Sequence, residues 1–191
     1  MEKLSSEQSE TSDRVLEFDL SAELRHGIAV SNLAYALSKE LGLPHEQCYD
    51  LAIAGMLHDI GKLKLRSYIN GQESNPMVIE ELKYVRMHST LGYEELKDQG
   101  YSDFVLESIL YHHENYDGSG YPSNLAGKEI PIGARILRVC DVFCALSQDR
   151  SYRKAFDKHT VMELMIDKIK NFDLEVFLAF QRVVHASQAG K

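Results

Sequence analysis

The segment Tyr111–Pro122 carries two adjacent histidines and a carboxylate, His112, His113 and Glu114, directly before a loop with two glycines and a proline. Adjacent imidazoles are costly to bury without partners, and a metal ion is a natural partner for both. The glycines let the backbone approach a bulky or charged ligand, and the proline stiffens the exit of the loop. The segment therefore predicts one part of a metal centre beside a ligand pocket.

A second group of polar residues stands where burial would be expensive. His58 and Asp59 end an apolar helical run at residues 51–57, and Asp141 has apolar neighbours on both sides. An unpaired carboxylate in such a place costs several kcal/mol, on the order of 2–7 for polar groups in general. Taken alone, His58 or Asp59 also fits the capping of backbone groups at a helix end.

Two more histidines, His26 and His88, lie on predicted helices. A lone histidine among apolar neighbours is more often a satisfied core residue than a ligand. The whole set is different, because five of the eight histidines and two aspartates then need partners. Mixed imidazole and carboxylate ligands suit iron, manganese, zinc or nickel better than calcium or magnesium. The candidate ligands are His26, His58, Asp59, His88, His112, His113 and Asp141.

The elements that must position these residues are predicted to be helices. Apolar residues recur at Leu24, Ile28, Leu33 and Leu37, and Gly42 with Pro44 ends this first helix. A glycine- and asparagine-bearing segment at 66–77 is predicted to be a loop. The further predicted helices are 46–59 with a break near Gly61, 78–88, 90–97, 102–113, 132–147, 158–170 and 174–186. No strand alternation is sustained, so the fold class is all-α.

Length and composition predict one domain at residues 15–191, preceded by a polar tail or linker remnant at 1–14. The net charge of −8 argues against binding of a nucleic-acid polymer, which needs a basic surface. Three cysteines form no disulfide framework, which predicts a reducing cytoplasm. No apolar run reaches membrane-spanning length.

The order of the motifs resembles the HD-GYP subgroup of the HD-domain metal-dependent phosphohydrolases. The match runs from His26 through His58-Asp59-Ile60-Gly61-Lys62, His88 and His112-His113-Glu114 to Asp117-Gly118-Ser119-Gly120-Tyr121-Pro122 and Asp141. It covers roughly residues 20–160. The His-Asp pair alone is a weak signal, whereas the full ordered set is highly specific. The resemblance implies a single compact helical bundle around a centre of two or three metal ions.

The resemblance also implies an activity and a division of the ligands. Members of the subgroup hydrolyse cyclic di-GMP, to pGpG and in some cases on to GMP, through a hydroxide that bridges the metals. His26, His58, Asp59 and Asp141 would hold one divalent ion. The second would be held by His88, His112 and His113, with Asp59 bridging. Iron or manganese is expected, with zinc and nickel as alternatives, and Asp59 and Lys62 are the expected catalytic residues.

The number of metals is predicted from one position. Three-metal members of the subgroup carry a glutamate four residues before the first histidine, and here that position is Ala22. Glu23 is adjacent, but neighbouring residues on a helix point about 100° apart. We therefore expect two metal ions and not three.

The substrate contacts implied by the resemblance are Lys62, Gly120, Tyr121, Pro122, Arg150 and Arg153, and the residues expected to support ligands or the loop are Glu114 and Asp117. The chain departs from the subgroup at Ser151, at Cys144 and in a segment at 64–69 that is expected to form a lid. Cys140 and Cys144 are interpreted as small buried hydrophobic residues rather than a redox pair.

Two other functions stay open. A catalytically weak or inactive module would act by binding a nucleotide or a protein, with the GYP loop contacting a cyclase domain or a sensor protein. An HD phosphohydrolase for another nucleotide, such as cyclic GMP-AMP, is the further alternative. Turnover of a cyclic dinucleotide by the metal-loaded protein separates these possibilities.

Overall fold

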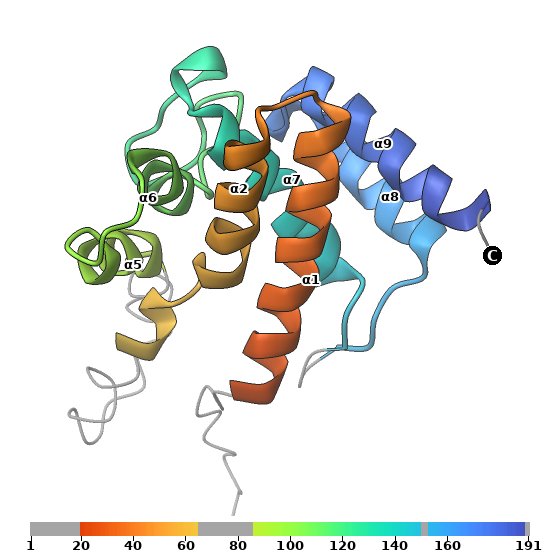
Figure 1. Ribbon diagram of the computed structural model, residues 1–191. Helices are drawn as coiled ribbons and strands as arrows, with labels where there is room; N and C mark the ends of the chain where they lie inside the picture. The colour runs from red at the N-terminus through yellow and green to blue at the C-terminus, as the bar shows by residue number, and fades with distance from the viewer. Residues whose placement is uncertain (1–19, 65–85, 150–152, 190–191) are drawn as a thin grey trace, which may run out of the picture.

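The computed structural model describes residues 20–64, 86–149 and 153–189, and within these ranges every regular element is a helix (Figure 1). The predicted all-α fold class is confirmed. The α-helices are α1 (Leu20–Glu40), α2 (His45–Leu57), α5 (His88–Leu96), α6 (Asp103–Leu110), α7 (Ile132–Leu146), α8 (Lys158–Asp167) and α9 (Leu174–Ala189). Two 3₁₀ turns are η1 (Gly127–Glu129) and η2 (Ile169–Asn171). The predicted tail at 1–14 and loop at 66–77 lie outside the described residues.

Helices α1 and α2 form an antiparallel pair joined by a short turn (Figure 1). Gly42 has a φ of 73°, which a glycine adopts without steric cost, and the amide of Leu43 donates to the carbonyl of Ser38 at 3.0 Å. The predicted end of the first helix at Gly42 and Pro44 is therefore confirmed.

The buried row of α1 differs from the row that predicted the helix. Leu24 and Ile28 are 47% and 51% exposed, whereas the core face is formed by His26, Val30, Ala34 and Leu37. Leu37 of the predicted row is buried and Leu33 packs against the core, so only the first half of that row, Leu24 and Ile28, faces solvent. His26 stands at the head of the row of core residues.

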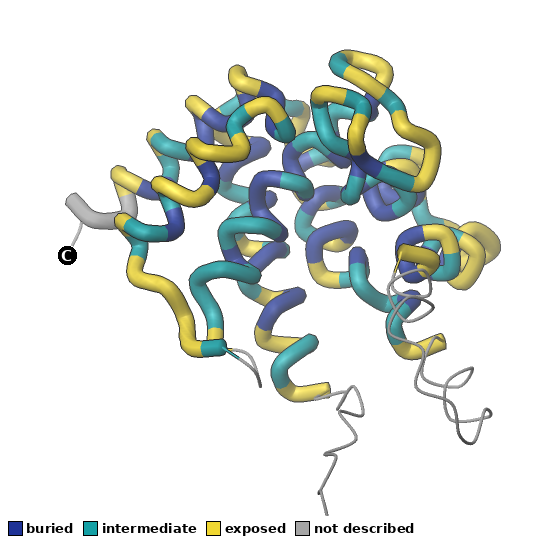
Figure 2. The backbone as a smooth tube through the Cα atoms, turned by 180° about the vertical axis from the view of Figure 1, so that it is seen from behind, coloured by how far each residue is buried: buried dark blue, intermediate teal, exposed yellow. Residues whose placement is uncertain are grey.

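Helix α7 is the central element and packs against α1, α2, α6, α8 and α9. Its buried side includes Ile136, Leu137, Val139 and Cys140, together with the site residue Asp141. Figure 2 shows the buried backbone running through the middle of the bundle and exposed positions along its rim. The carboxylate of Asp141 therefore lies inside the bundle, on the central helix α7.

Several helix ends lie elsewhere than the sequence pattern predicts. Helix α2 ends at Leu57, before His58 and Asp59, and the described residues 61–64 are helical again where a break was expected. Helix α6 ends at Leu110, so His112 and His113 follow it in a turn rather than lying on it.

Two further boundaries are displaced. Helix α5 begins at His88, where the predicted helix 78–88 was to end, and residues 78–85 lie outside the described part of the chain. Helix α8 ends at Asp167 and is followed by η2, which replaces the predicted helical run to Lys170. The ends predicted for the helix at 132–147 agree with α7 to within one residue.

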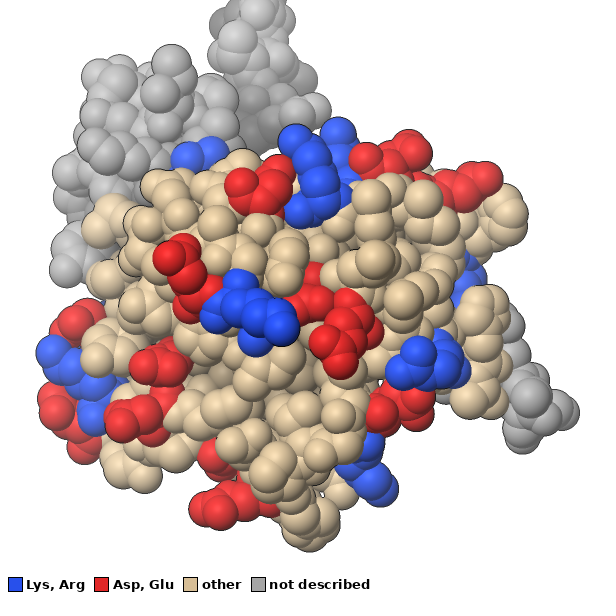
Figure 3. Space-filling model, turned by 90° about the horizontal axis from the view of Figure 1, so that it is seen from above, with Lys and Arg blue, Asp and Glu red and all other residues tan. Residues whose placement is uncertain are grey.

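Charged side chains are mixed on the surface. On the face in Figure 3, Lys and Arg alternate with Asp and Glu and form no continuous basic area. In the part of the chain that the structure describes, none of the helices combines the length and apolar character needed to cross a membrane.

Candidate metal centre

A first cluster consists of His26 on α1, His58 in the turn after α2 and Asp141 on α7. Nε2 of His26 lies 3.1 Å from Oδ1 of Asp141, and Nε2 of His58 lies 3.8 Å from the same oxygen. The ligand atoms of these three residues all lie within 4.8 Å of one another. His26 and His58 are only 3% and 1% exposed, so bulk solvent does not reach their rings.

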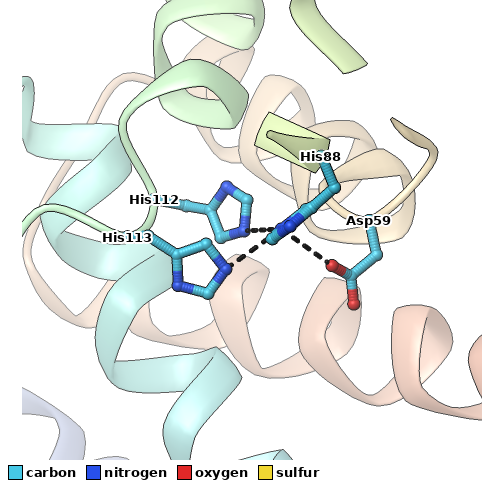
Figure 4. A group of neighbouring side chains, drawn as sticks. All are labelled: Asp59, His88, His112 and His113. Atoms are coloured by element: carbon cyan, nitrogen blue, oxygen red, sulfur yellow. Dashed lines mark hydrogen bonds and ion pairs between the residues drawn. The ribbon is translucent and has the colours of Figure 1, made fainter. Parts of the chain in front are cut away.

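A second cluster lies beside it and consists of Asp59, His88, His112 and His113 (Figure 4). Nε2 of His88 is 3.3 Å from Nε2 of His112 and 3.0 Å from Nε2 of His113. The side chains come from the turn after α2, the first residue of α5 and the turn after α6, and they point toward a common centre. Residues distant in the sequence are thus brought together in the way the motifs predict.

Asp59 connects the two clusters through its two carboxylate oxygens. Oδ1 lies 3.3 Å from Nε2 of His88, and Oδ2 lies 3.2 Å from Nε2 of His58. A carboxylate that presents one oxygen to each cluster has the arrangement needed to bridge two ions.

The outer nitrogens of three histidines face oxygen atoms. Nδ1 of His58 donates to the carbonyl of Gly55 at 2.8 Å, and Nδ1 of His112 donates to that of Ile109 at 2.6 Å. Nδ1 of His26 lies 3.2 Å from Oε1 of Gln148. A hydrogen bond at Nδ1 fixes the tautomer and leaves the lone pair of Nε2 directed at the cluster, as metal-binding histidines require.

The nitrogen and oxygen atoms of the two clusters are better satisfied by metal ions than by hydrogen bonds to one another. Nε2 of His58 is buried and has no hydrogen-bond partner of acceptable geometry, although Oδ2 of Asp59 is 3.2 Å away. The Nε2 atoms of His88, His112 and His113 lie close together beside Oδ1 of Asp59, and three neutral imidazoles cannot all donate to one another. Two divalent ions would satisfy these atoms.

The electrostatics separate the two clusters. Burial opposes protonation of His58, but the carboxylates of Asp59 and Asp141 outweigh it and raise the pKa of His58 to about 9. Burial lowers the pKa of His113 to about 3 and holds the pKa of His112 well below its usual value. Burial opposes ionisation of Asp59, yet His58 and Lys62 keep its pKa well below the usual range. His112 and His113 are therefore kept neutral and ready to ligate.

Two glycines allow the close approaches that build the centre. A Cβ on Gly61 would collide with the carbonyl oxygen of His88, and a Cβ on Gly120 would collide with the backbone of Glu114 and Asn115. The first contact presses the segment after Asp59 against the start of α5. The second folds the glycine loop back onto the turn that carries the paired histidines.

The predicted loop residues lie beside the second cluster. The ring of Tyr121 stacks on His113 with centroids 4.8 Å apart and planes 23° apart, and the Tyr121–Pro122 peptide bond is cis. Glu114 is buried and accepts a hydrogen bond from the amide of Ser123 at 2.6 Å. Asp117 is exposed, accepts from Ser119 and pairs with Lys170 at 3.3 Å. The hydrogen bonds of both carboxylates given above thus join them to the backbone of the glycine loop.

Lys62 lies at the edge of the first cluster. Its Nζ is 2.6 Å from Oδ2 of Asp59 and 3.2 Å from Oε2 of Glu23. Glu23 thus contacts the centre only through Lys62. Among the described residues, Glu23 belongs to neither of the two ligand clusters. The expectation of two metals rather than three stays a prediction.

Arg153, also expected to contact substrate, is placed differently from Lys62. Arg153 donates to the carbonyls of Ala145 and Leu146 at the end of α7, and its guanidinium lies over the ring of Phe156. These contacts cap a helix and direct Arg153 to the backbone. Arg150 and Ser151 lie outside the described residues. Of the expected lid at 64–69, only Lys64 is described.

The cysteines behave as small apolar residues. Cys48, Cys140 and Cys144 are free and buried. Burial raises the pKa of Cys144 to about 12 and that of Cys140 well above its usual value, so both thiols stay protonated.

Sequence reasoning missed Gln148, Asn115 and Arg138. Gln148 faces His26, and Arg138 donates through Nε to Oδ1 of Asn115 at 3.0 Å. The only signal in the sequence is spacing on α7 and just beyond it, since Arg138 and Gln148 are three and seven residues from Asp141. That spacing places them near one helix face.

Comparison with known proteins identifies the family. The model of the HD domain matches residues 5–176. The chain belongs to the HD-domain family. Its curated relatives include the cyclic di-GMP phosphodiesterase PA4108 of Pseudomonas aeruginosa, 36% identical over 160 residues that cover 83% of this chain and 38% of that protein. Another is the 3'3'-cGAMP-specific phosphodiesterase 1 of Vibrio cholerae, 36% identical over 157 residues that cover 80% of this chain and 36% of that protein.

Solved structures agree with this HD domain in fold. Bd1817, an HDG"Y"P protein from Bdellovibrio bacteriovorus, superposes with a TM-score of 0.67 at 23% identity, covering 85% of this chain and 52% of that one. The predicted HD-GYP type of HD domain is confirmed by the family match and the relatives together. The chain spans well under half of the length of the two curated relatives above.

Proposed function

We propose that this HD domain is a metal-dependent phosphodiesterase that hydrolyses cyclic di-GMP to pGpG. The observation that carries the proposal is the position of Asp59, which presents one carboxylate oxygen to each of two histidine clusters. Two adjoining cation sites with a shared ligand suit in-line hydrolysis of a phosphodiester, because both the attacking and the leaving oxygen need stabilisation.

The residues would hold two divalent ions. His26, His58, Asp59 and Asp141 would bind the first, and His88, His112 and His113, with Asp59, the second. When bound, the ions supply Lewis acidity that activates water and neutralises the phosphodiester. The mixed imidazole and carboxylate set suits iron, manganese, zinc or nickel better than calcium or magnesium, and iron or manganese are the ions we propose.

Protein side chains complete the site. Lys62, fixed between Asp59 and Glu23, is close enough to the centre to donate from Nζ to a phosphate oxygen and to offset the charge that develops there. Tyr121 presents a ring that is stacked on His113 and offers an aromatic surface at the edge of the pocket. Gly120 and Pro122 shape this edge, since Gly120 packs directly on the backbone of Glu114 and Asn115.

The substrate class rests on the relatives. One curated relative is named for cyclic di-GMP and another for 3'3'-cGAMP, so both dinucleotides are reasonable substrates. We favour cyclic di-GMP as the first substrate to test. Three free buried thiols fit action in a reducing cytoplasm, and contact of the GYP loop with a cyclase domain or sensor protein is a separate expectation.

The test is turnover by protein loaded anaerobically with Fe(II) or Mn(II). Cyclic di-GMP and cyclic GMP-AMP are supplied in parallel, products are separated by chromatography, and metals are counted by elemental analysis. Asp59→Asn is the site variant. The matched control is Asp167→Asn, which removes an exposed carboxylate at the end of α8.

We expect conversion of cyclic di-GMP to pGpG by the wild type and the Asp167 variant and none by the Asp59 variant. Preferred cleavage of cyclic GMP-AMP would replace the substrate and keep the enzyme class. Tight binding of a dinucleotide by fully metal-loaded protein without any cleavage would overturn the proposal in favour of a binding module.

A further inference from the structure

Arg138 on α7 lies beside the second cluster. Its Nε donates to Oδ1 of Asn115 at 3.0 Å, and its Nη1 lies 3.5 Å from Nδ1 of His113. Figure 4 shows that this outer nitrogen of His113 points away from His88. The guanidinium therefore borders the centre from outside, one helical turn before Asp141.

The charge of Arg138 is not matched by a carboxylate. Lys62 pairs with Asp59 and Glu23, and Arg135 pairs with Asp173 at 2.5 Å. Across residues 20–64, 86–149 and 153–189, no carboxylate lies within ion-pair distance of Arg138, and its partners Asn115 and His113 are uncharged. A half-buried cation without a counter-ion is costly, and an anionic ligand removes that cost.

A second guanidinium, that of Arg86, lies near Tyr121 and His113. Arg86 lies over the ring of Tyr121 at 5.5 Å, and that ring stacks in turn on His113. Arg86 precedes α5 and Arg138 belongs to α7, so two separate elements bring positive charge to the surroundings of Tyr121 and His113. Asn115 holds the guanidinium of Arg138 in place, which lowers the conformational entropy lost when the guanidinium binds an anion.

We infer that Arg138 binds the second phosphate of a cyclic dinucleotide, the one that is not hydrolysed, and so selects substrates with two phosphates. The inference rests on the proposed function. A cyclic dinucleotide carries two phosphodiesters, and only one can occupy the pair of cation sites. The other needs a cation outside the clusters, and a fixed guanidinium suits two oxygens of one phosphate.

The test compares two substrates on metal-loaded protein. Cyclic di-GMP has two phosphates, whereas bis(p-nitrophenyl) phosphate has one. Arg138→Gln should raise KM for cyclic di-GMP about 10- to 100-fold, the loss expected for one charge-assisted hydrogen-bonded contact. Its kcat/KM for bis(p-nitrophenyl) phosphate and its metal content should stay at the wild-type level. Arg138→Lys should give a KM for cyclic di-GMP between those of the wild type and Arg138→Gln, because lysine keeps the positive charge but cannot donate two parallel hydrogen bonds to one phosphate.

Lys128→Gln removes one positive charge from the exposed η1 turn of the same loop and is the matched control. This variant should keep the wild-type KM for cyclic di-GMP and the wild-type kcat/KM for bis(p-nitrophenyl) phosphate. An unchanged KM for cyclic di-GMP in Arg138→Gln, or an equal loss on both substrates, or a loss of metal, would each overturn the inference while leaving the proposed function standing. Failure of the wild type to cleave cyclic di-GMP would instead overturn the proposed function, and the inference with it.

Discussion

Gly61 and the carbonyl oxygen of His88 approach so closely that no Cβ fits between them. Gly61 follows Asp59 by two residues, and His88 begins α5. The contact therefore fixes the distance between Asp59 and His88, whose side chains meet at 3.3 Å. A glycine that carries no functional group thus sets the geometry that links the two clusters.

Replacing Gly61 with alanine should separate these elements. The added methyl group must displace the backbone of His88, which we expect to lower the free energy of unfolding by about 2 kcal/mol, within the range for overpacking. The metal bound at the second cluster should be lost first. Gly92→Ala is the control, because its Cβ would meet only ordinary contacts at 3.4 Å or more. Chemical denaturation and elemental analysis are the measurements, and a Gly61 variant as stable and metal-rich as Gly92→Ala would contradict this account.

The shared carboxylate predicts unequal losses of metal. Asp59→Asn should deplete both ions, since Asp59 faces His58 through one oxygen and His88 through the other. His88→Ala should deplete one ion only, because His88 belongs to the second cluster alone. Elemental analysis of variants purified and reloaded side by side is the measurement. Equal stoichiometry in the two variants would show that Asp59 does not bridge.

The pKa of His58 predicts how the stability of metal-free protein depends on pH. Its folded-state pKa of about 9 lies above the ordinary value of 6.5, so the folded state holds the proton more tightly. This contribution, on the order of a few kcal/mol, is complete below about pH 6.5 and is lost as the pH rises through about 9. We expect the melting temperature of chelator-treated protein to fall over that window.

The control for this pH effect is His58→Asn, which removes the titrating group. The fall between pH 6.5 and 9 should flatten in that variant. It should also flatten in metal-loaded wild type, where an ion takes the place of the proton. An identical slope in metal-free wild type and His58→Asn would assign the effect to other groups.

The sequence was sufficient to predict which side chains converge, because their chemistry and order are unusual, and their role as metal ligands stays a prediction. His26, His58 and Asp141 are costly to bury singly, and the structure brings them together as the motifs predicted. Leu24 and Ile28 show the weakness of apolar spacing, because they marked the helix correctly but lie on its exposed side, whereas Leu37 of the same row is buried.

Helix ends were harder to predict for a physical reason. The turn after α6 is held by Nδ1 of His112 on the carbonyl of Ile109, and that bond depends on the position the ring takes in the cluster. A local pattern of apolar residues does not contain such a tertiary restraint. Arg138 and Gln148 were missed on the same ground, since their partners Asn115 and His26 are 23 and 122 residues away in the chain.

Gln148 supplies the last prediction, because it is the acceptor that orients His26. Oε1 lies 3.2 Å from Nδ1 of His26, whose Nε2 faces Asp141. Gln148→Leu keeps a similar volume but removes the acceptor, so Nδ1 loses its partner and the ring its fixed tautomer. Affinity for the first metal should fall about 10- to 100-fold, the usual effect of losing a residue that orients a ligand.

Gln148→Glu should restore that affinity, since a carboxylate accepts the same hydrogen bond. Competition with a fluorescent chelator measures both variants without relying on turnover. The second metal should be held at wild-type affinity in each, because Gln148 contacts His26 and no histidine of the second cluster among the described residues. Equal affinities in the leucine and glutamate variants would mean that His26 is oriented by Asp141 and its packing on α1 alone.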